Sequence, residues 1–237
     1  MNQNPHIHHL QRFLDSQGAD YRRALADVQL KRVSAGQAVS AGTALAESVV
    51  QKLKSHLAKG SQPVVDAPAD EGWQVWCDAP VVLQHGIHSL FGVVLWHHGA
   101  VRFAAALDFE NEALCWAGPG EGAHVGRKAR VADRAELDNA FISVPAVPFP
   151  AVLAEAGAQG VISRQPLADV LAVASGAHDA CVQTDMPYEH NMAALMFVQE
   201  AGGMLTDAKS QPVSPATQTI VAANSKLQGR LLKALRG

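Results

Sequence analysis

The hydrophobic pattern of the chain changes its period between the two halves, and this change limits the folds that are open to it. Between residues 89 and 117, apolar runs are separated by short polar joints, which is typical of antiparallel strands. From residue 141 onward, short apolar runs alternate with helical stretches that end in glycine. Antiparallel strands followed by alternating helices and strands predict a layered α/β or α+β architecture.

The composition supplies a large buried core. The chain has 237 residues, of which 48% are hydrophobic and 17% are charged, whereas a disordered chain needs the opposite balance. This length suits one large domain or two small ones. We expect a single unit over residues 1–237, with a lobe of helices and antiparallel sheet over 1–130 and an α/β lobe over 131–237.

Charge and cysteine use argue against several classes of protein. The formal net charge is −3 and the sequence has no dense basic patch, so we expect no nucleic acid as a partner. Apolar runs are short and interrupted, which argues against a membrane span, and residues 1–10 lack a signal-peptide core. Cys77, Cys115 and Cys181 are odd in number and far apart. We therefore expect no disulfide framework and a cytoplasmic location.

Helical spacing of apolar residues predicts two long helices in the first half. They cover about residues 5–28 and 40–59, the second with Ser40 as its N-cap and Gly60 as its end, and a short strand or turn is expected over 30–36. Strands are expected over 73–76, 89–96, 101–109 and 112–117, the middle two joined by a hairpin turn over 97–100.

The second half is expected to alternate between the two kinds of element. Strands are predicted over 141–144, 161–163, 179–183, 204–206 and 219–223. Helices are predicted over 148–156, 167–175, 189–201 and 225–235.

Several segments of the second half resemble one enzyme family. Residues 167–180 are similar to its "ALDLALVAAGRADA" helix and strand, residues 200–207 to its "EAGGxxTD" turn, and residues 220–224 to its "IVAAN" strand and cap. Upstream, residues 120–123 resemble its "GxGA" segment and residues 39–50 its "VTxADxxAExxI" stretch. On these motifs the chain resembles the inositol monophosphatase family, within the fructose-bisphosphatase-like sugar phosphatases.

The resemblance carries expectations about fold and chemistry. It implies an αβαβα sandwich of alternating helix and sheet layers, and a homodimer. It also implies hydrolysis of a phosphate monoester, in which several carboxylates gather two or three Mg²⁺ ions beside the phosphate. Magnesium requires hard oxygen ligands in near-octahedral geometry.

The sequence departs from the family where its acidic ligands should be. The aspartate of "VTxAD" falls on Thr43, and the "GEE" loop falls near residues 64–68, where Asp66 is the one acid. The aspartate of "WDxAA" falls on His190, with Glu189 in place of the tryptophan.

The signature strand "WxxDPxDGT" is altered most. Its two aspartates become Trp76 and Ala79, and Asp78 can replace at most one of them. The "GT" that binds phosphate through backbone N–H groups becomes Pro80 and Val81, and proline has no N–H to donate.

These losses predict a phosphatase fold without phosphatase chemistry. Removing one partner of a desolvated charged cluster costs about 3–5 kcal/mol, so the loss of several acids removes a factor of roughly 10⁵ or more in rate. We expect no catalytic residue, no metal ligand and no cofactor. The residual cleft, with candidates Thr43, Asp66, Asp78, Glu189 and His190, is expected to bind a small phosphorylated ligand or another anion.

Two other hypotheses stay open. One is a working phosphomonoesterase that uses Asp66, Asp78, Glu189 and His190, to which His85 and His88 could add ligands for Zn²⁺, Ni²⁺ or Mn²⁺. The other is unrelated catalysis through the Cys77 thiol with His85 as its base.

Simpler interpretations are preferred for the remaining polar residues. We interpret His97-His98 as a solvated hairpin turn, and His6, His8 and His9 as part of a polar N-terminus. Asp169 lies in an apolar helix and is expected to make a structural hydrogen bond.

Overall fold

The computed structural model describes residues 4–30, 35–85, 87–146 and 149–236. The chain divides into two compact units, Met1–Trp116 and Ala117–Gly237. The division therefore falls after Trp116, whereas the sequence pattern placed the change of lobe at 130/131.

The first unit consists of two long helices and an antiparallel sheet. Its elements are α1 (Pro5–Gln29), α2 (Ala35–Leu57), β1 (Glu71–Cys77), α3 (Pro80–Leu83), β2 (Phe91–His97), β3 (Ala100–Asp108) and β4 (Ala113–Gly118), the last of which crosses the division. Strands β1, β2, β3 and β4 are neighbours in this order. The expected strands and the β2–β3 hairpin are confirmed, and α3 was not predicted.

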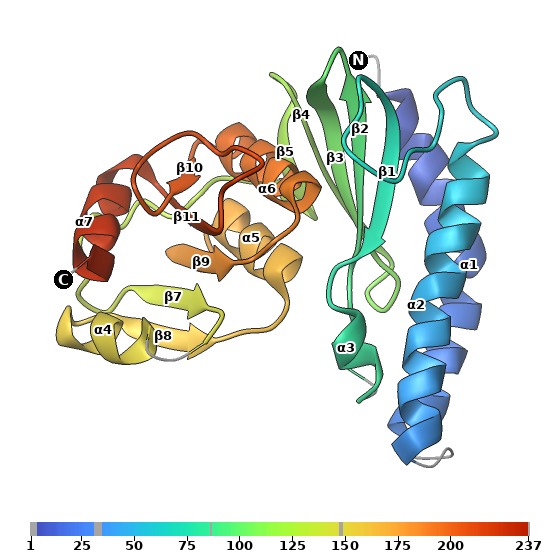
Figure 1. Ribbon diagram of the computed structural model, residues 1–237, viewed down its shortest axis with the longest axis horizontal. Coiled ribbons are helices and arrows are strands. Elements are labelled where there is room, and N and C mark those ends of the chain that lie inside the picture. The colour runs from blue at the N-terminus through green and yellow to red at the C-terminus, as the bar shows by residue number, and fades with distance from the viewer. Residues whose placement is uncertain (1–3, 31–34, 86, 147–148, 237) are drawn as a thin grey trace. The chain divides into compact units, whose positions relative to one another are not determined.

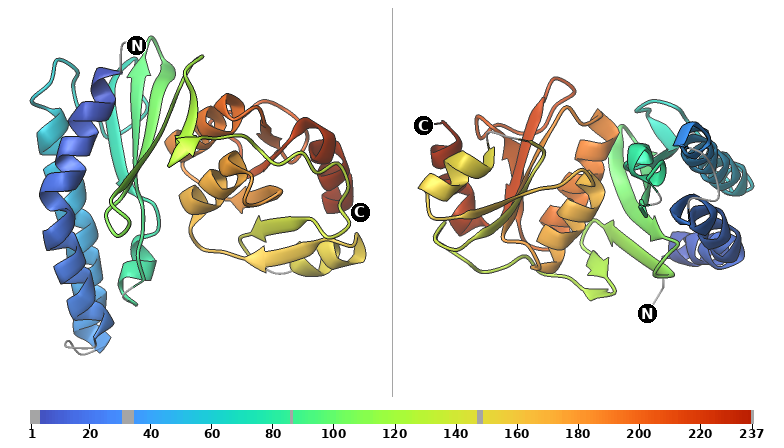
Figure 2. Two further views of the ribbon diagram at one scale, coloured as in Figure 1. Left: turned by 180° about the vertical axis from the view of Figure 1, so that it is seen from behind. Right: turned by 90° about the horizontal axis from the view of Figure 1, so that it is seen from below.

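Helices α1 and α2 lie side by side against this sheet (Figures 1 and 2). The core between them is apolar and largely aromatic: Phe13 and Leu14 from α1 and Leu53 from α2 pack with Phe103 and Phe109, all at most 3% exposed. Burial of such side chains stabilises the fold by about 1.5–3 kcal/mol each.

The start of α2 differs from the prediction. The helix begins at Ala35, so Ser40 lies inside it and is not its N-cap. Of the expected strand or turn over 30–36, Leu30 lies in a turn, Ala35 and Gly36 already belong to α2, and residues 31–34 lie outside the described part of the chain. The residues before Ser40 include alanine and glutamine, which favour helix, and this preference outweighs the capping preference of one serine.

The second unit contains a five-stranded sheet with helices on both faces, and two short strands that are not part of that sheet. Its elements are β5 (Gly122–Val125), β6 (Arg127–Lys128), β7 (Phe141–Val144), α4 (Phe149–Glu155), β8 (Gln159–Ile162), α5 (Pro166–Ser175), β9 (Ala180–Thr184), α6 (Tyr188–Glu200), β10 (Met204–Asp207), β11 (Thr219–Ala223) and α7 (Ser225–Arg236). The expected helices and strands are all confirmed within about two residues, except that the predicted start of one helix at Pro148 lies outside the described residues. The short strand β6 was not predicted.

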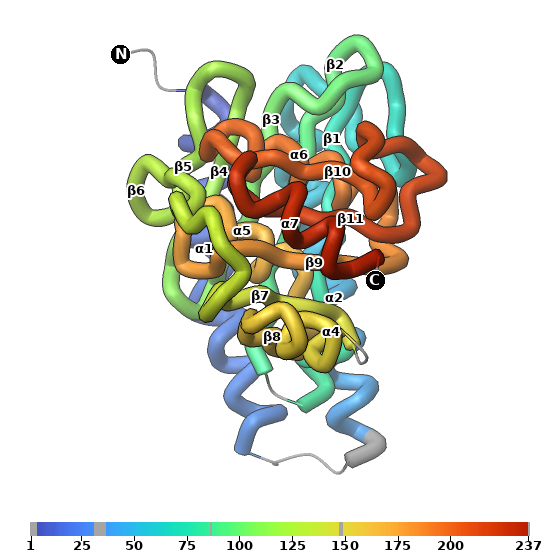
Figure 3. Tube along the Cα trace, turned by 90° about the vertical axis from the view of Figure 1, so that its left-hand side faces the viewer, coloured from blue at the N-terminus to red at the C-terminus, as the bar shows by residue number. Residues whose placement is uncertain are grey.

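The order of strands in this sheet is β10-β11-β9-β7-β8 (Figure 3). Strand β7 runs parallel to β8 and β9, whereas β11 is antiparallel to β9 and β10. Helices α4 and α7 cover one face, with Leu153, Leu227 and Leu231 packed against the strands, and α5 and α6 lie on the other (Figure 1).

Residues of the resembling motifs hold this second unit together. Asn224, which is 5% exposed, accepts hydrogen bonds from the N–H groups of Lys226 and Leu227 at the start of α7 and donates to the carbonyls of Ala132 and Arg134. It is therefore both an N-cap and a tie to a distant loop.

A glutamate and a glycine of these motifs also have structural roles. Both carboxylate oxygens of Glu200 accept backbone N–H groups, from Gly120 and Gly122, each at 3.0 Å. Gly176 ends α5 with φ of 77°, a left-handed conformation that glycine adopts without steric cost.

None of the helices in the described part of the chain is long and apolar enough to span a membrane.

Candidate functional site

The five predicted site residues are shared between the two units. Thr43, Asp66 and Asp78 belong to the first unit, and Glu189 and His190 to the second.

Thr43 and Asp66 are both exposed and have local partners. The Thr43 hydroxyl donates a 3.0 Å hydrogen bond to the carbonyl of Val39 within α2. Asp66 forms an ion pair with Lys54, and its side chain is 88% exposed. The hydrogen bond from Lys54 lowers the pKa of Asp66. Neither side chain is held in a desolvated cleft of its unit.

The loop after β1 is held by backbone and serine contacts. The N–H of Asp78 donates to the carbonyl of Leu90 at 2.9 Å, and the N–H of Ala79 donates to the hydroxyl of Ser89 at 3.0 Å. Pro80 has no N–H. The resemblance places phosphate-binding amides at residues 80 and 81, and the first of these positions therefore has no N–H, while the two N–H groups just before it are engaged within the loop.

Trp76 stands where the resemblance places an aspartate, and it is packed rather than solvated. The indole is 9% exposed and lies opposite Gly92 on β2. A Cβ added at Gly92 would lie 2.2 Å from two atoms of this ring. A glycine on the neighbouring strand therefore makes the room that the indole needs, and Ala79, 5% exposed, is equally apolar.

Glu189 and His190 lie in the first turn of α6 and are half-buried. The glutamate is favourable there because the helix dipole stabilises negative charge at the N-terminal end. Burial lowers the pKa of His190 to about 4, so its imidazole is neutral near pH 7.

These residues do not fit the magnesium ions that the resemblance implies. Magnesium takes oxygen ligands, whereas Trp76 and Ala79 offer no ligand atom and His190 offers a nitrogen. Asp66, the remaining acid of its loop, is paired with Lys54. We therefore derive no magnesium-dependent step for this chain.

His88 belongs to a polar network that the sequence pattern did not reveal. Its Nε2 lies 2.9 Å from Oδ1 of Asp108, and its Nδ1 lies 3.1 Å from the hydroxyl of Tyr21 and 3.6 Å from Glu110. Burial raises the pKa of Tyr21 well above its ordinary value. Burial also raises the pKa of Asp108, but hydrogen bonds from His88 and Asn111 outweigh it and bring that pKa to about 2.

This network ties α1 to the sheet through three side chains from α1, the loop before β2 and the end of β3. His88 is thus already engaged by a carboxylate and a phenol within the first unit. That His88 adds a metal ligand to an atypical phosphomonoesterase site stays a prediction, and these contacts do not support it.

Cys77 has the environment of an inert thiol. Burial raises its pKa to about 11, and the thiol lies 3.6 Å from the Ser89 hydroxyl. A reactive cysteine needs a lowered pKa, because the thiolate is the nucleophile. The geometry therefore favours the interpretation of Cys77 as a packing residue.

Asp169 in the second unit makes the structural hydrogen bond that was predicted. The side-chain amide of Gln183 donates to it at 2.8 Å, and the carboxyl is 4% exposed. Burial raises its pKa. Nearby, the Ser143 hydroxyl and His178 Nδ1 are 3.1 Å apart. Ser143 is fully buried, so this pair has no access for a substrate.

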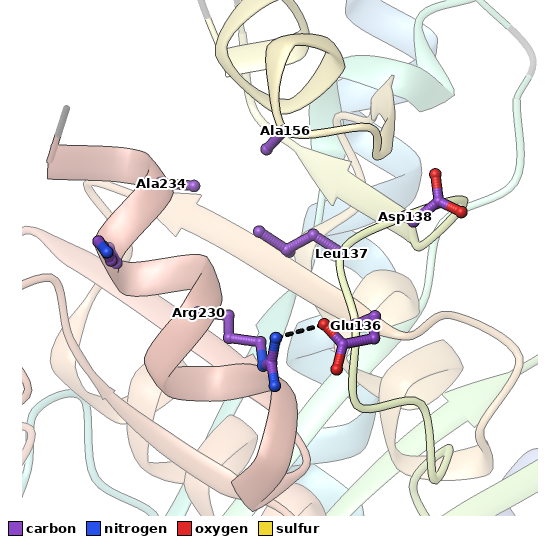
Figure 4. A pocket seen from close by; sticks show the side chains of 7 residues that line it. Glu136, Leu137, Asp138, Ala156, Arg230 and Ala234 are labelled. Atoms are coloured by element: carbon purple, nitrogen blue, oxygen red, sulfur yellow. Dashed lines mark hydrogen bonds and ion pairs between the residues drawn. The ribbon is translucent and has the colours of Figure 1, made fainter.

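A pocket of about 630 Å³ in the second unit contains none of the predicted site residues (Figure 4). Glu136 and Arg230 form an ion pair across it, and Leu137 and Ala156 supply apolar walls (Figure 4). Because its charged groups neutralise one another, the pocket does not have the character of an anion site.

The fold is that of inositol monophosphatase-like αβαβα proteins, which confirms the resemblance and the fold class that the sequence indicated. The suhB protein of Bartonella henselae has a TM-score of 0.77 at 19% identity and covers 96% of this chain and 99% of its own. SaIMPase-II with inositol monophosphate bound has a TM-score of 0.74 at 13% identity, covering 95% and 92%.

A curated relative is similar in sequence as well. The putative Nus factor SuhB of Neisseria meningitidis serogroup B is 30% identical over 163 residues. These residues are 63% of this chain and 62% of the relative, so the chain spans somewhat less than two thirds of the curated relatives it matches. No family model matches the chain.

Proposed function

We propose that the chain is an inositol monophosphatase-like protein that has lost magnesium-dependent hydrolysis and acts by binding. The observation that carries this proposal is the segment from the end of β1 to the start of α3, residues 76–80. Trp76 and Ala79 are buried and apolar there, the Ala79 N–H is bonded to Ser89, and Pro80 has none. The segment that should hold metals and phosphate instead completes the packing of the first unit.

The changed ligand positions predict a large loss in the rate of phosphate-ester hydrolysis. A two-metal site works by gathering several carboxylates around the ions. The reaction rate falls tenfold for every ~1.4 kcal/mol of transition-state stabilisation that is lost. With several ligand positions changed, we expect turnover to fall below any ordinary enzyme rate.

The binding role is proposed by analogy with two related proteins. SaIMPase-II has been solved with inositol monophosphate bound, so we propose a small phosphorylated ligand or another anion as the ligand of this chain. The Neisseria relative is named a putative Nus factor, which is compatible with a role other than hydrolysis. We further propose a homodimer, as the resemblance implies, and a cytoplasmic location, because the three cysteines are odd in number and far apart. We propose no nucleic-acid partner, because the net charge is −3 and basic residues are dispersed, and no membrane partner, because apolar runs are short.

An activity assay tests the loss of hydrolysis. The purified protein, free of any histidine tag, is incubated with Mg²⁺ and a panel of inositol, sugar and nucleotide phosphates, and released phosphate is measured. We expect no release above the blank. Turnover above about 1 s⁻¹, an ordinary enzyme rate, would contradict the proposal.

A binding assay tests the second half of the proposal. Inositol monophosphate is titrated into the metal-free protein by calorimetry, with free inositol as the control. Binding of the phosphate ester but not of inositol supports an anion site. Absence of binding to both would leave hydrolysis lost but contradict the proposed ligand class.

One observation favours the alternative of an active phosphomonoesterase with an atypical site. The lowered pKa of His190 keeps its imidazole neutral, and neutral imidazole is the form that binds metals. Phosphate release that appears with Mn²⁺ or Zn²⁺ and disappears in His190→Ala, but not in the control His8→Ala, would support it.

A further inference from the structure

The tip of the β2–β3 hairpin carries a group of three ligand-type side chains. Glu71 at the start of β1 is the register partner of His97 at the end of β2, and His98 follows in the turn. The imidazole and carboxylate ligand atoms of Glu71, His97 and His98 all lie within 4.8 Å of one another.

Both imidazoles face the same carboxylate. Nδ1 of His97 lies 2.7 Å from Oε1 and 2.9 Å from Oε2 of Glu71, and Nδ1 of His98 lies 3.7 Å from Oε1. The two rings are 4.1 Å apart between centroids. One histidine is enough to pair with a carboxylate, so the approach of a second ring to the same oxygen calls for a further explanation.

The backbone of the turn fixes where the His98 side chain lies. His98 has φ of 53° and Gly99 has φ of 68°, and both values are positive, as in the type I′ turn that is common in two-residue hairpins. Histidine is one of the side chains that are enriched at positive φ. The N–H of Gly99 donates to the carbonyl of Asp70 at 3.1 Å, which ties the turn to the start of β1.

The separations suit a small divalent cation. Zinc binds histidine nitrogen and carboxylate oxygen at about 2.0–2.2 Å, which in a tetrahedral site puts ligand atoms about 3.4 Å apart. The observed 2.7 Å and 3.7 Å separations from Oε1 of Glu71 bracket this value. Two nitrogens and one oxygen suit zinc, nickel or copper better than magnesium or calcium.

We propose that Glu71, His97 and His98 form a surface binding site for Zn²⁺, with water in the remaining coordination position. The strands hold two of the three ligands in place before the ion arrives, because Glu71 and His97 are paired across the sheet. The side chains of Glu71, His97 and His98 are 34%, 47% and 74% exposed, so the ion has open access. The bound ion links the start of β1 to the hairpin turn.

The test measures zinc binding by the full chain without a histidine tag. Equilibrium dialysis against ZnCl₂ is expected to give one tightly bound ion, and Glu71→Gln and His98→Asn are each expected to weaken its binding at least tenfold. Asparagine suits the type I′ turn, so His98→Asn keeps the fold and its urea midpoint is the check. Zinc is expected to raise the midpoint of the parent protein but not that of His98→Asn.

The matched control is His8→Asn, which removes an exposed histidine from α1. It is expected to leave zinc affinity unchanged. The proposal is overturned if the parent protein binds no zinc at 1 mM, or if His98→Asn keeps the parent affinity while His8→Asn loses it.

Discussion

The two units differ in how they match the resembling family, although His190 of the second unit also stands where the family has an acid. In the second unit the matching residues are kept and have structural roles, since Asn224 caps α7 and Glu200 binds two backbone N–H groups. In the first unit the positions of the expected acids have changed, and Trp76 and Ala79 now pack in the interior. The residues that match the family in the second unit hold the fold together, whereas the changed positions of the first unit are those at which the family has metal ligands.

The largest effect is expected where the second unit depends on a retained residue. Asn224→Ala removes two accepted and two donated hydrogen bonds at a site that is 5% exposed. We expect a loss of about 3 kcal/mol in the free energy of unfolding, measured by urea denaturation. Asn224→Asp keeps the cap and loses the two donated bonds, so its stability should lie between those of the parent and Asn224→Ala. A loss below about 1 kcal/mol in Asn224→Ala, the usual contribution of one hydrogen bond, would break the comparison.

The next effect tests whether Trp76 has become a packing residue of the first unit. Gly92→Ala places a Cβ against the indole, and we expect a loss of about 2 kcal/mol because overpacking displaces the ring. Tryptophan emission should shift with it. Trp76→Leu in the same chain should recover part of the loss, since the two residues are coupled.

A second glycine serves as the control for that experiment. Gly229 lies in α7 with nothing within 4 Å of an added Cβ. Gly229→Ala should therefore stabilise the protein by up to about 1 kcal/mol. Equal effects at Gly92 and Gly229 would argue against a packed Trp76.

A pH effect of about 1–2 kcal/mol is expected from the Asp108 network. The folded-state pKa of about 2 lies below the ordinary value of 3.8, so folding favours the ionised form. This contribution is fully present above about pH 4 and is lost as pH falls from about 4 to 2. Asp108→Asn should flatten the dependence of the urea midpoint on pH in that window. Asp20→Asn, at an exposed acid, should leave the slope unchanged.

The smallest effect is expected at Asp66, an acid of the first unit that lies near the family's acidic loop. Asp66 is exposed and forms its ion pair with Lys54, and exposed ion pairs contribute little. Asp66→Asn should leave the urea midpoint and the binding of inositol monophosphate unchanged. A measurable loss of inositol monophosphate binding in Asp66→Asn would show that Asp66 contributes to ligand binding.

Local patterns were sufficient for most of the secondary structure. Helix α5 ends at Gly176 as expected, and β7 and β11 have the predicted bounds. Such features depend on a few neighbouring residues, on hydrophobic period and on the conformational freedom of glycine. The start of α2 was missed because the helix propensity of the residues before Ser40 outweighed the capping preference of that serine.

The contacts of the candidate sites could not be predicted from local sequence patterns. Tyr21 and His88 are 67 residues apart in sequence, and Glu71 meets His97 because of the register between β1 and β2. The room that Gly92 makes for Trp76 depends on the same register. The sequence by itself determined which segments are helices and strands and which acids of the family are missing. Only the tertiary structure decided which distant side chains meet, because strand register and helix packing join residues that no local pattern relates.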